Sequence, residues 1–185
     1  MRETRVSYRY AKSLLDLAIE KGQLEQVRED MQLVRDAVHE NHDLELLLKS
    51  PVIKTDKKQE ILKAIFGGKI GVITTEFIDI ITRKRREAEL EVIAESFLSQ
   101  YRKNKNIVTA SITTATPLDE MLRKQVLDLV RKAAGTEVEL TEKIDDSLIG
   151  GFVLRVGDRQ VDTSMIRQIR MLERSFSENP FIKEF

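Results

Sequence analysis

The spacing of apolar residues changes once along the chain, and this change constrains the fold more than any other feature. Up to about residue 105, apolar residues recur at steps of three and four, the period of a helix with one buried face. From Ile107 onward they alternate with polar residues, which is typical of a strand with one buried face. The sequence therefore predicts two domains, a helical one over residues 1–105 and a mixed one over residues 106–185.

Six helices are predicted in the first domain. Their apolar stripes and capping residues lie within residues 4–21, 24–38, 43–48, 55–66, 72–82 and 90–101. Gly22 and Gly67-Gly68 end two of these helices, and Pro51 ends a third because proline disfavours helix in the residue before it. Asp43 and Thr55 are predicted N-caps. Short loops between amphipathic helices favour an antiparallel bundle.

The second domain is predicted to hold a short mixed sheet and two helices. One strand begins at Val108, a helix follows Thr116-Pro117, and Val138 marks a second strand. Phe152 to Val156 predicts a third strand, which Gly157-Asp158 would turn back toward Val161. A last helix is capped by Asp162, Thr163 or Ser164. The predicted fold class is α+β, a six-helix bundle followed by this small domain.

The composition excludes several classes of function. The chain has 185 residues, of which 31 are basic and 31 acidic, so that it lacks the excess of cations that a general nucleic-acid binder needs. It contains no cysteine, which excludes disulfides, iron–sulfur clusters and thiolate zinc sites. No apolar run approaches the roughly 18 residues of a membrane span, and no signal core follows Met1. We expect an untargeted, complete chain without cofactors.

Two charged features are better explained by solvation than by a site. His39 and His42 are three residues apart, but a stable metal site needs further ligands, so we expect two solvated histidines at a helix C-terminus. The basic run Arg83 to Arg86 could contact phosphate, anionic lipid or an acidic partner. Glutamates at 87, 89 and 91 cancel most of its field, which favours a solvated helix junction.

No arrangement of residues predicts catalysis or nucleotide binding. Gly150-Gly151 precedes a strand instead of opening a helix, and no lysine follows at the spacing of a phosphate-binding loop, so the glycines more simply allow close backbone approach. Ser147 and Ser164 are far in sequence from either histidine, and Asp145 and Asp146 point to opposite faces of an extended segment. We therefore expect no enzyme.

The stretch from Asp145 to Ser164 carries a family resemblance. Its characteristic residues are Asp145, Ser147, Leu148, Gly150, Gly151, Gly157, Asp162 and Ser164. In this order and spacing they resemble the C-terminal signature of the ATP synthase delta subunit family, whose mitochondrial counterpart is the oligomycin-sensitivity-conferring protein. The chain departs from the family at Asp146, where relatives often carry proline, and at Ile166 and Ile169 in the last helix.

Motifs elsewhere resemble the same family, so the resemblance covers essentially the whole chain. Tyr10 to Ala18 is similar to its first-helix motif, and Leu48 to Pro51 to its next landmark. Arg86 stands at the position of a characteristic arginine, and Ala115 to Leu118 resembles the opening of the second domain.

The resemblance implies a non-catalytic stator component of the F-type ATP synthase. By family analogy the helical domain grips the N-terminal helix of an alpha subunit of the catalytic head, and the second domain holds the b subunits of the peripheral stalk. Such a protein would resist rotor torque during proton-driven ATP synthesis, at the cytoplasmic face of a bacterial inner membrane. The alternative class is an adaptor or nucleic-acid-associated protein that uses Arg83 to Arg86.

The family groove lies between the first and fifth helices. This places the alpha-subunit site at Tyr10, Ala11, Leu14, Phe77, Ile78 and Ile81. We expect a few of these apolar side chains to be exposed in the isolated protein; the alternative is that all six belong to the core of the bundle. Recognition of a helix in an apolar groove needs no reactive group.

Overall fold

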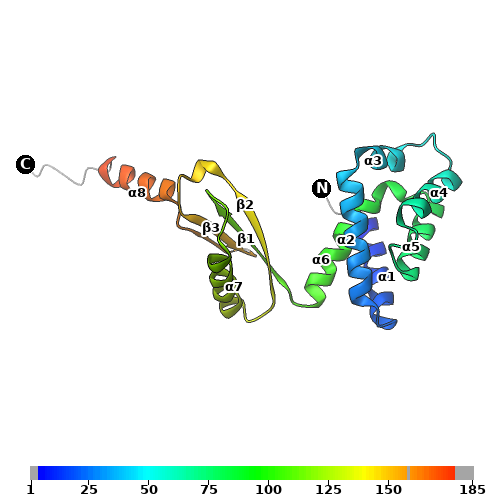
Figure 1. Cartoon of the computed structure of the whole chain (residues 1–185), viewed down its shortest axis with the longest axis horizontal. Coiled ribbons are helices and arrows are strands. Elements are labelled where there is room, and N and C mark those ends of the chain that lie inside the picture. Colours follow the sequence, from blue (N-terminus) through cyan, green and yellow to red (C-terminus); the bar gives the residue numbers. More distant parts are fainter. Residues whose placement is uncertain (1–3, 158, 178–185) are drawn as a thin grey trace, which may run out of the picture. The chain divides into compact units, whose positions relative to one another are not determined.

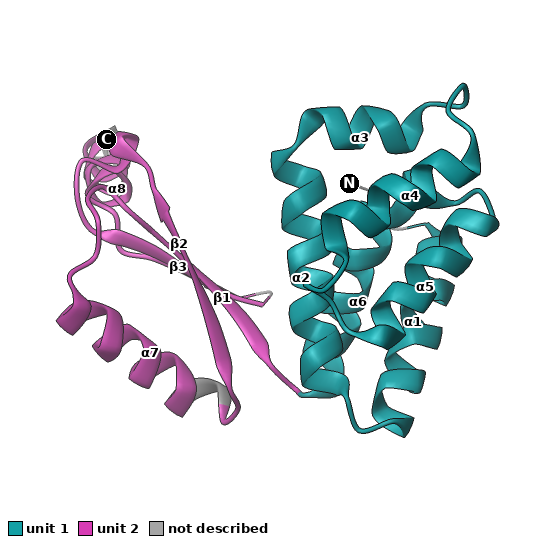
Figure 2. Cartoon of the chain, turned by 45° about the vertical axis from the view of Figure 1, so that its right-hand side comes forward, with its two compact units in different colours: residues 1–105 teal, residues 106–185 magenta. Residues whose placement is uncertain are grey.

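The computed structural model describes residues 4–157 and 159–177, and within that part residues 133, 134 and 177 are described by their backbone alone. The chain divides into two compact units, Met1–Lys105 and Asn106–Phe185, which Figure 2 colours separately. No helix in the described ranges has the length and apolar character needed to cross a membrane.

The first unit is helical throughout its regular elements. Its described helices are α1 (Arg5–Glu20), α2 (Leu24–Glu40), α3 (His42–Lys49), α4 (Thr55–Phe66), α5 (Val72–Arg83) and α6 (Leu90–Asn104), with a 3-10 turn η1 (Glu87–Glu89) before α6. The predicted six-helix bundle is thus confirmed. Helix α6 packs against both α1 and α2 (Figure 2). Its Ile93, Ala94 and Phe97 are fully buried. The core of this unit therefore lies along α6.

Local hydrogen bonds explain where the helices begin. The Thr4 hydroxyl accepts a bond from the backbone N–H of Ser7, and the Ser7 hydroxyl accepts one from the backbone N–H of Thr4, which together form a capping box at the start of α1. Helix α3 starts at His42 because the Asn41 side chain accepts a bond from the Leu44 N–H; the prediction of Asp43 as the cap was wrong. The predicted cap Thr55 is instead the first residue of α4.

A buried polar contact joins α2 to α5. Asp30 of α2 accepts hydrogen bonds from the Gly71 N–H at 2.8 Å and from the Thr74 hydroxyl at 2.7 Å. Both donors lie at the start of α5, so the Asp30 carboxylate provides the cap that Gly71 cannot supply from its own side chain. The contact fixes where α5 begins against α2.

A second polar contact joins α2 to the last turn of α6. The Tyr101 hydroxyl donates to Glu25 at 2.6 Å, and the Lys105 ammonium lies 2.9 Å from the other oxygen of Glu25. Hydrogen bonds from Tyr101 and then from Lys105 lower the pKa of the Glu25 carboxyl. The Arg28 guanidinium lies over the Tyr101 ring, 5.8 Å from its centroid.

The second unit is a four-stranded mixed sheet with two helices. In chain order its elements are β1 (Val108–Thr114), α7 (Glu120–Ala134), β2 (Val138–Ile144), the 3-10 turn η2 (Asp146–Leu148), β3 (Phe152–Val156), β4 (Arg159–Asp162) and α8 (Met165–Ser177), as Figure 1 labels in part. The strand order is β2-β1-β3-β4, with β1 and β2 parallel and the other neighbours antiparallel. This confirms the predicted α+β class.

The small core of this unit lies between α7 and the sheet. Ala110, Val130 and Val138 are buried there, and Leu154 packs beside them. Helix α7 begins at Glu120, three residues after Pro117, so the predicted start at Pro117 was wrong. The predicted turn after β3 falls partly outside the description, because Asp158 is not among the described residues; Gly157 has a φ of +56°.

Candidate partner-binding surfaces

The structure buries most of the residues predicted to form the alpha-subunit groove. Tyr10 is half-buried, whereas the other five lie in the interior of the bundle: Ala11, Leu14, Phe77, Ile78 and Ile81. The expectation that a few of the six are exposed therefore fails for these five. The physical reason is that Ala11, Leu14 and their neighbours at helical spacing form the stripe of α1 that packs on α6.

Exposed apolar side chains lie next to the predicted residues on both helices. On α1, Leu17 is 39% exposed and stands seven residues after Tyr10, on the same side of the helix. On α5, Ile80 is 51% exposed, and Ile73 is half-buried seven residues before it. Ile80 has a signal in the sequence, because residues 77, 78, 80 and 81 are all apolar and one helix face cannot bury all four.

The other side of α1 is basic and hollowed. A shallow depression of about 490 Å³ is lined by Thr4, Arg5, Tyr8, Arg9 and Lys12. No residue of α5 takes part in it, so this depression is not the predicted groove. A much smaller hollow of about 30 Å³ lies between α4 and α5 and includes Ile78.

The residues of the C-terminal signature build the start of α8. Gly151 has a φ of +78°, which side chains rarely adopt, and its Cα faces the backbone of Thr163 and Ser164. The Met165 N–H donates to the carbonyl of Gly150 at 3.0 Å, and the Thr163 N–H to that of Phe152 at 3.0 Å. The predicted close backbone approach is confirmed at Gly151, and these glycines serve the fold.

Two aspartates of the signature cap this region. Asp145 accepts a bond from the Ser147 N–H at 3.0 Å, and Asp162 accepts one from the Ser164 N–H at 2.9 Å. Bonds from the side chain and then the backbone of Ser147 lower the pKa of Asp145, and those from Ser164 lower the pKa of Asp162. The Ser164 hydroxyl in turn accepts the Arg167 N–H, so Ser164 is the cap of α8.

Helix α8 presents an exposed apolar stripe. Met165, Ile169, Leu172 and Phe176 follow one another at steps of four, three and four, and all four are exposed. Phe176 is 83% exposed. On α7, Met121 and Leu129 are exposed as well. Apolar residues gathered on a helix in this way mark an interaction surface.

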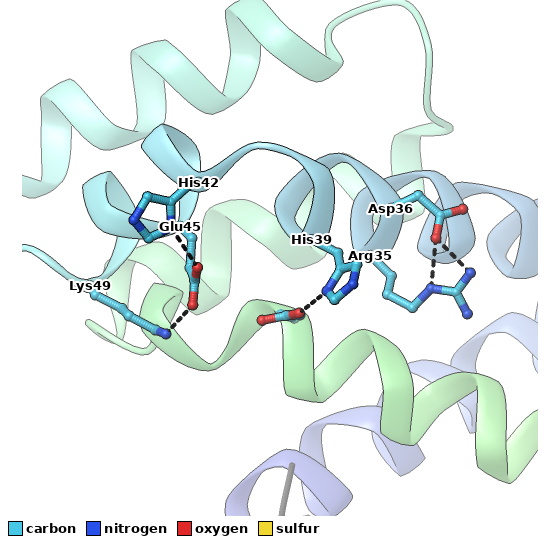
Figure 3. Close-up of polar contacts among 7 residues, drawn as sticks. Arg35, Asp36, His39, His42, Glu45 and Lys49 are labelled. Atoms are coloured by element: carbon cyan, nitrogen blue, oxygen red, sulfur yellow. Dashed lines mark hydrogen bonds and ion pairs between the residues drawn. The ribbon is translucent and has the colours of Figure 1, made fainter. Parts of the chain in front are cut away.

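The two histidines contact carboxylates on different helices, as Figure 3 shows for His42. His39, in the last turn of α2, lies 3.2 Å from the buried Glu91 of α6. His42 is the first residue of α3 and lies 3.3 Å from Glu45, so the predicted place at a helix C-terminus holds only for His39. Bonds from Lys49 and then His42 lower the pKa of Glu45. No cluster of three metal-binding side chains occurs in the part of the chain described.

The basic run lies exposed where α5 ends and η1 begins. Arg83 is the last residue of α5, Arg85 has a φ of +56°, and Arg86 pairs with Glu89 at 3.4 Å. The run is thus a helix junction, as predicted, although only Arg86 finds an acidic partner among the described residues. The buried Lys58 stabilises the junction, because its ammonium group lies 2.7 Å from the Glu87 carboxylate of η1.

Comparison with known proteins agrees across the whole chain. The family model for the ATP synthase delta (OSCP) subunit matches residues 6–176. ATP synthase subunit delta of Cytophaga hutchinsonii is 41% identical over 178 residues, covering 96% of this chain and 97% of the relative. That of Christiangramia forsetii is 40% identical over 184 residues, covering all of both chains.

A solved structure shows the same fold. A chain in the mitochondrial ATP synthase hexamer of Toxoplasma gondii superposes with a TM-score of 0.71 at 25% identity, over 95% of this chain and 99% of that one.

Proposed function

Because the chain belongs to the ATP synthase delta (OSCP) family, whose members are non-catalytic stator components linking the catalytic head to the peripheral stalk, we propose which of its surfaces makes each link. The helical unit binds the N-terminal helix of an alpha subunit, and the α+β unit binds the b subunits. The observation that carries this proposal is that α1, α5 and α8 each leave apolar side chains uncovered.

The head-binding surface combines exposed contacts with a buried floor. Tyr10 and Leu17 of α1 and Ile73 and Ile80 of α5 contact the incoming helix through their exposed apolar atoms. The buried members of the predicted set lie beneath them and fix the two helices in place: Ala11, Leu14, Phe77, Ile78 and Ile81. An amphipathic helix places its apolar face on such a surface by residues at steps of three and four.

The stalk-binding surface is the apolar stripe of α8. Leu172 and Phe176 lie within it, and Arg167, Arg170 and Arg174 supply positive charge on the same helix. A helix of thirteen residues with an uncovered apolar side is marginal alone in water and is stabilised by packing on another helix. Helical b subunits provide such a partner, with acidic residues facing the arginines.

The protein is peripheral to the membrane through its complex. We further place it at the cytoplasmic face of a bacterial inner membrane, where it holds the head against the torque of the rotor. The support for this location is the bacterial origin of its relatives.

Peptide binding by the full chain tests both links in one crossed design. Fluorescence anisotropy would measure affinity for two labelled peptides from the same organism, one from the amino terminus of the alpha polypeptide and one from the carboxyl terminus of the b polypeptide. Ile80→Asp should weaken binding of the alpha peptide at least tenfold and leave binding of the b peptide unchanged, and Leu172→Asp should do the reverse. A charge placed in an apolar contact should cost at least about 1.4 kcal/mol, the free energy to which a tenfold loss of affinity corresponds.

Leu33→Asp is the matched control, because Leu33 is a comparably exposed leucine on α2 outside both surfaces. It should change neither affinity, and circular dichroism should be the same for all three variants. The assignment of surfaces would be contradicted if one substitution weakened binding of both peptides, or if neither substitution weakened binding of either peptide.

A further inference from the structure

A hollow of the helical unit lies at the α3–α4 loop, and no residue of α1 lines it. It has a volume of about 840 Å³ and is bordered by the loop Ser50–Lys54, the first turn of α4, the end of α5 and η1. In Figure 2, α3 lies at the top of the helical unit, with α4 and α5 below it. We call it the α3–α4 hollow.

Positive charge dominates the lining of the α3–α4 hollow. Five basic and two acidic side chains line it: Lys49, Lys54, Lys58, Arg83 and Arg85, with Asp56 and Glu87. Lys49 pairs with Glu45 and Lys58 with Glu87. Lys54, Arg83 and Arg85 have no carboxylate within 4 Å in the described ranges, so these three cations are available to a ligand.

The floor of the hollow holds a buried ion pair. The buried Lys58 ammonium donates to the Leu48 carbonyl at 2.8 Å and to one oxygen of Glu87 at 2.7 Å. The second oxygen of Glu87 is buried and accepts no hydrogen bond from the described residues. Glu87 therefore neutralises Lys58 at the floor, and a complementary ligand has to supply negative charge for Lys54, Arg83 and Arg85.

The rim of the hollow is apolar on its loop side. Pro51, Val52 and Ile53 line it, and Val52 is 87% exposed. No aromatic side chain takes part in the described lining, so nothing there stacks on a base, as proteins that bind single-stranded nucleic acids require. A phosphate group offers no apolar part for Val52.

We propose that the α3–α4 hollow binds an acidic peptide segment of a partner polypeptide, a third interface beyond the two of the proposed function. Carboxylates of the segment pair with Arg83 and Arg85, whose planar guanidinium groups match a carboxylate with two parallel hydrogen bonds. An apolar side chain of the segment packs on Val52, which is exposed at the rim. Lys54 adds charge at the start of α4, where no side chain caps the helix.

A synthetic probe tests the charge requirement on the full chain. The probe is a fluorescein-labelled pentapeptide of four glutamates around a central leucine, titrated by anisotropy at low salt. Arg83→Gln combined with Arg85→Asn should weaken binding of the probe at least tenfold. Asparagine is chosen at position 85 because it tolerates the positive φ of that residue. The matched control, Lys21→Gln with Lys103→Gln, removes two exposed cations outside the hollow and should change affinity less than twofold.

A second pair of measurements tests the apolar contact. Val52→Ser should weaken the leucine probe at least threefold and leave a probe with serine in place of leucine unchanged, as a coupled pair requires. Absence of probe binding, equal weakening by the control, or displacement of the probe by inorganic phosphate at millimolar concentration would overturn the proposal. Tighter binding of a fluorescein-labelled deoxythymidine oligonucleotide at the same salt would also overturn it.

The outcome is separable from that of the proposed function. Val52→Ser should bind the alpha and b peptides with unchanged affinity, because Val52 lies in the α3–α4 loop and on neither of those surfaces.

Discussion

The Cα of Gly151 faces the carbonyl group of Thr163 so closely that the two cannot accommodate a side chain between them. A Cβ on Gly151 would overlap the Thr163 oxygen and lie 3.0 Å from the Cα of Ser164. Because Thr163 and Ser164 lead directly into α8, this contact ties the strand β3 to the start of the last helix. The glycine of the family signature therefore determines where the proposed stalk-binding helix begins.

We predict that Gly151→Ala destabilises the α+β unit more than Gly157→Ala does. Both glycines have positive φ, which costs an alanine about 1–2 kcal/mol, but a Cβ on Gly157 would meet no atom within 4 Å. The difference between the two variants in urea unfolding, followed by circular dichroism, measures the clash with Thr163. Equal destabilisation would show that the backbone at residue 163 moves aside without cost.

Lys58→Met should destabilise the helical unit by about 3–5 kcal/mol, because it leaves the buried Glu87 carboxylate without its cation. Adding Glu87→Gln to the same chain should recover much of this loss. The exposed Lys57→Met is the control and should stay within about 0.5 kcal/mol of the parent chain. Urea midpoints measure all three, and a Lys58 variant as stable as the control would contradict the prediction.

Ala11→Asp should unfold the helical unit, because Ala11 is fully buried against α6 and the new carboxylate has no cation there. The cost of about 3–5 kcal/mol is comparable to the whole stability of many domains. Ser13→Asp introduces the same charge two residues later, where the side chain is exposed. It should preserve the helical circular dichroism and weaken binding of the alpha peptide but not of the b peptide, since position 13 adjoins Tyr10 and Leu17 on α1.

The start of α8 should loosen at low pH. The pKa of Asp162 is lowered by its bonds from Ser164, so the charged form stabilises the fold at neutral pH. This contribution is complete above the ordinary aspartate pKa and is lost as the pH falls through the lowered value of the folded state. Carboxyl and amide NMR titration between pH 6 and 2 should show the Ser164 and Arg167 amides shifting with Asp162. Asp162→Asn should remove that dependence, and amides that titrate at an ordinary aspartate pKa would contradict it.

The fold was accessible from sequence because its signals are local. The stripe from Leu24 to Val38 and the alternation from Val108 each require one type of element, and the change of period between them separates the bundle from the sheet. The errors lie at the starts of helices, where several neighbouring residues could each serve as the N-cap. Asn41 caps α3 in place of Asp43, and α7 starts at Glu120 although Pro117 is compatible with a first helical turn.

The exposure of the candidate partner-binding residues was only partly predictable, because a motif does not distinguish core residues from contact residues. Ala11 and Ile81 follow the family pattern and are buried, whereas Ile80 and Leu17 on the same two helices are exposed. An apolar residue looks the same in sequence whether its own fold or a partner covers it. The α3–α4 hollow was not predictable at all, since Lys54 and Arg83 are 29 positions apart and only tertiary packing brings them to one cavity.

The contact between Tyr101, Glu25 and Lys105 acquires a mechanical meaning in a stator. Lys105 is the last residue of the helical unit, so tension transmitted along the backbone from residue 106 reaches this point first. Because Glu25 contacts both Tyr101 and Lys105, the last turn of α6 is linked to the start of α2 at this point. A force applied along the chain from residue 106 would have to break the contacts of Tyr101 and Lys105 with Glu25 before the final turn of α6 could separate from α2.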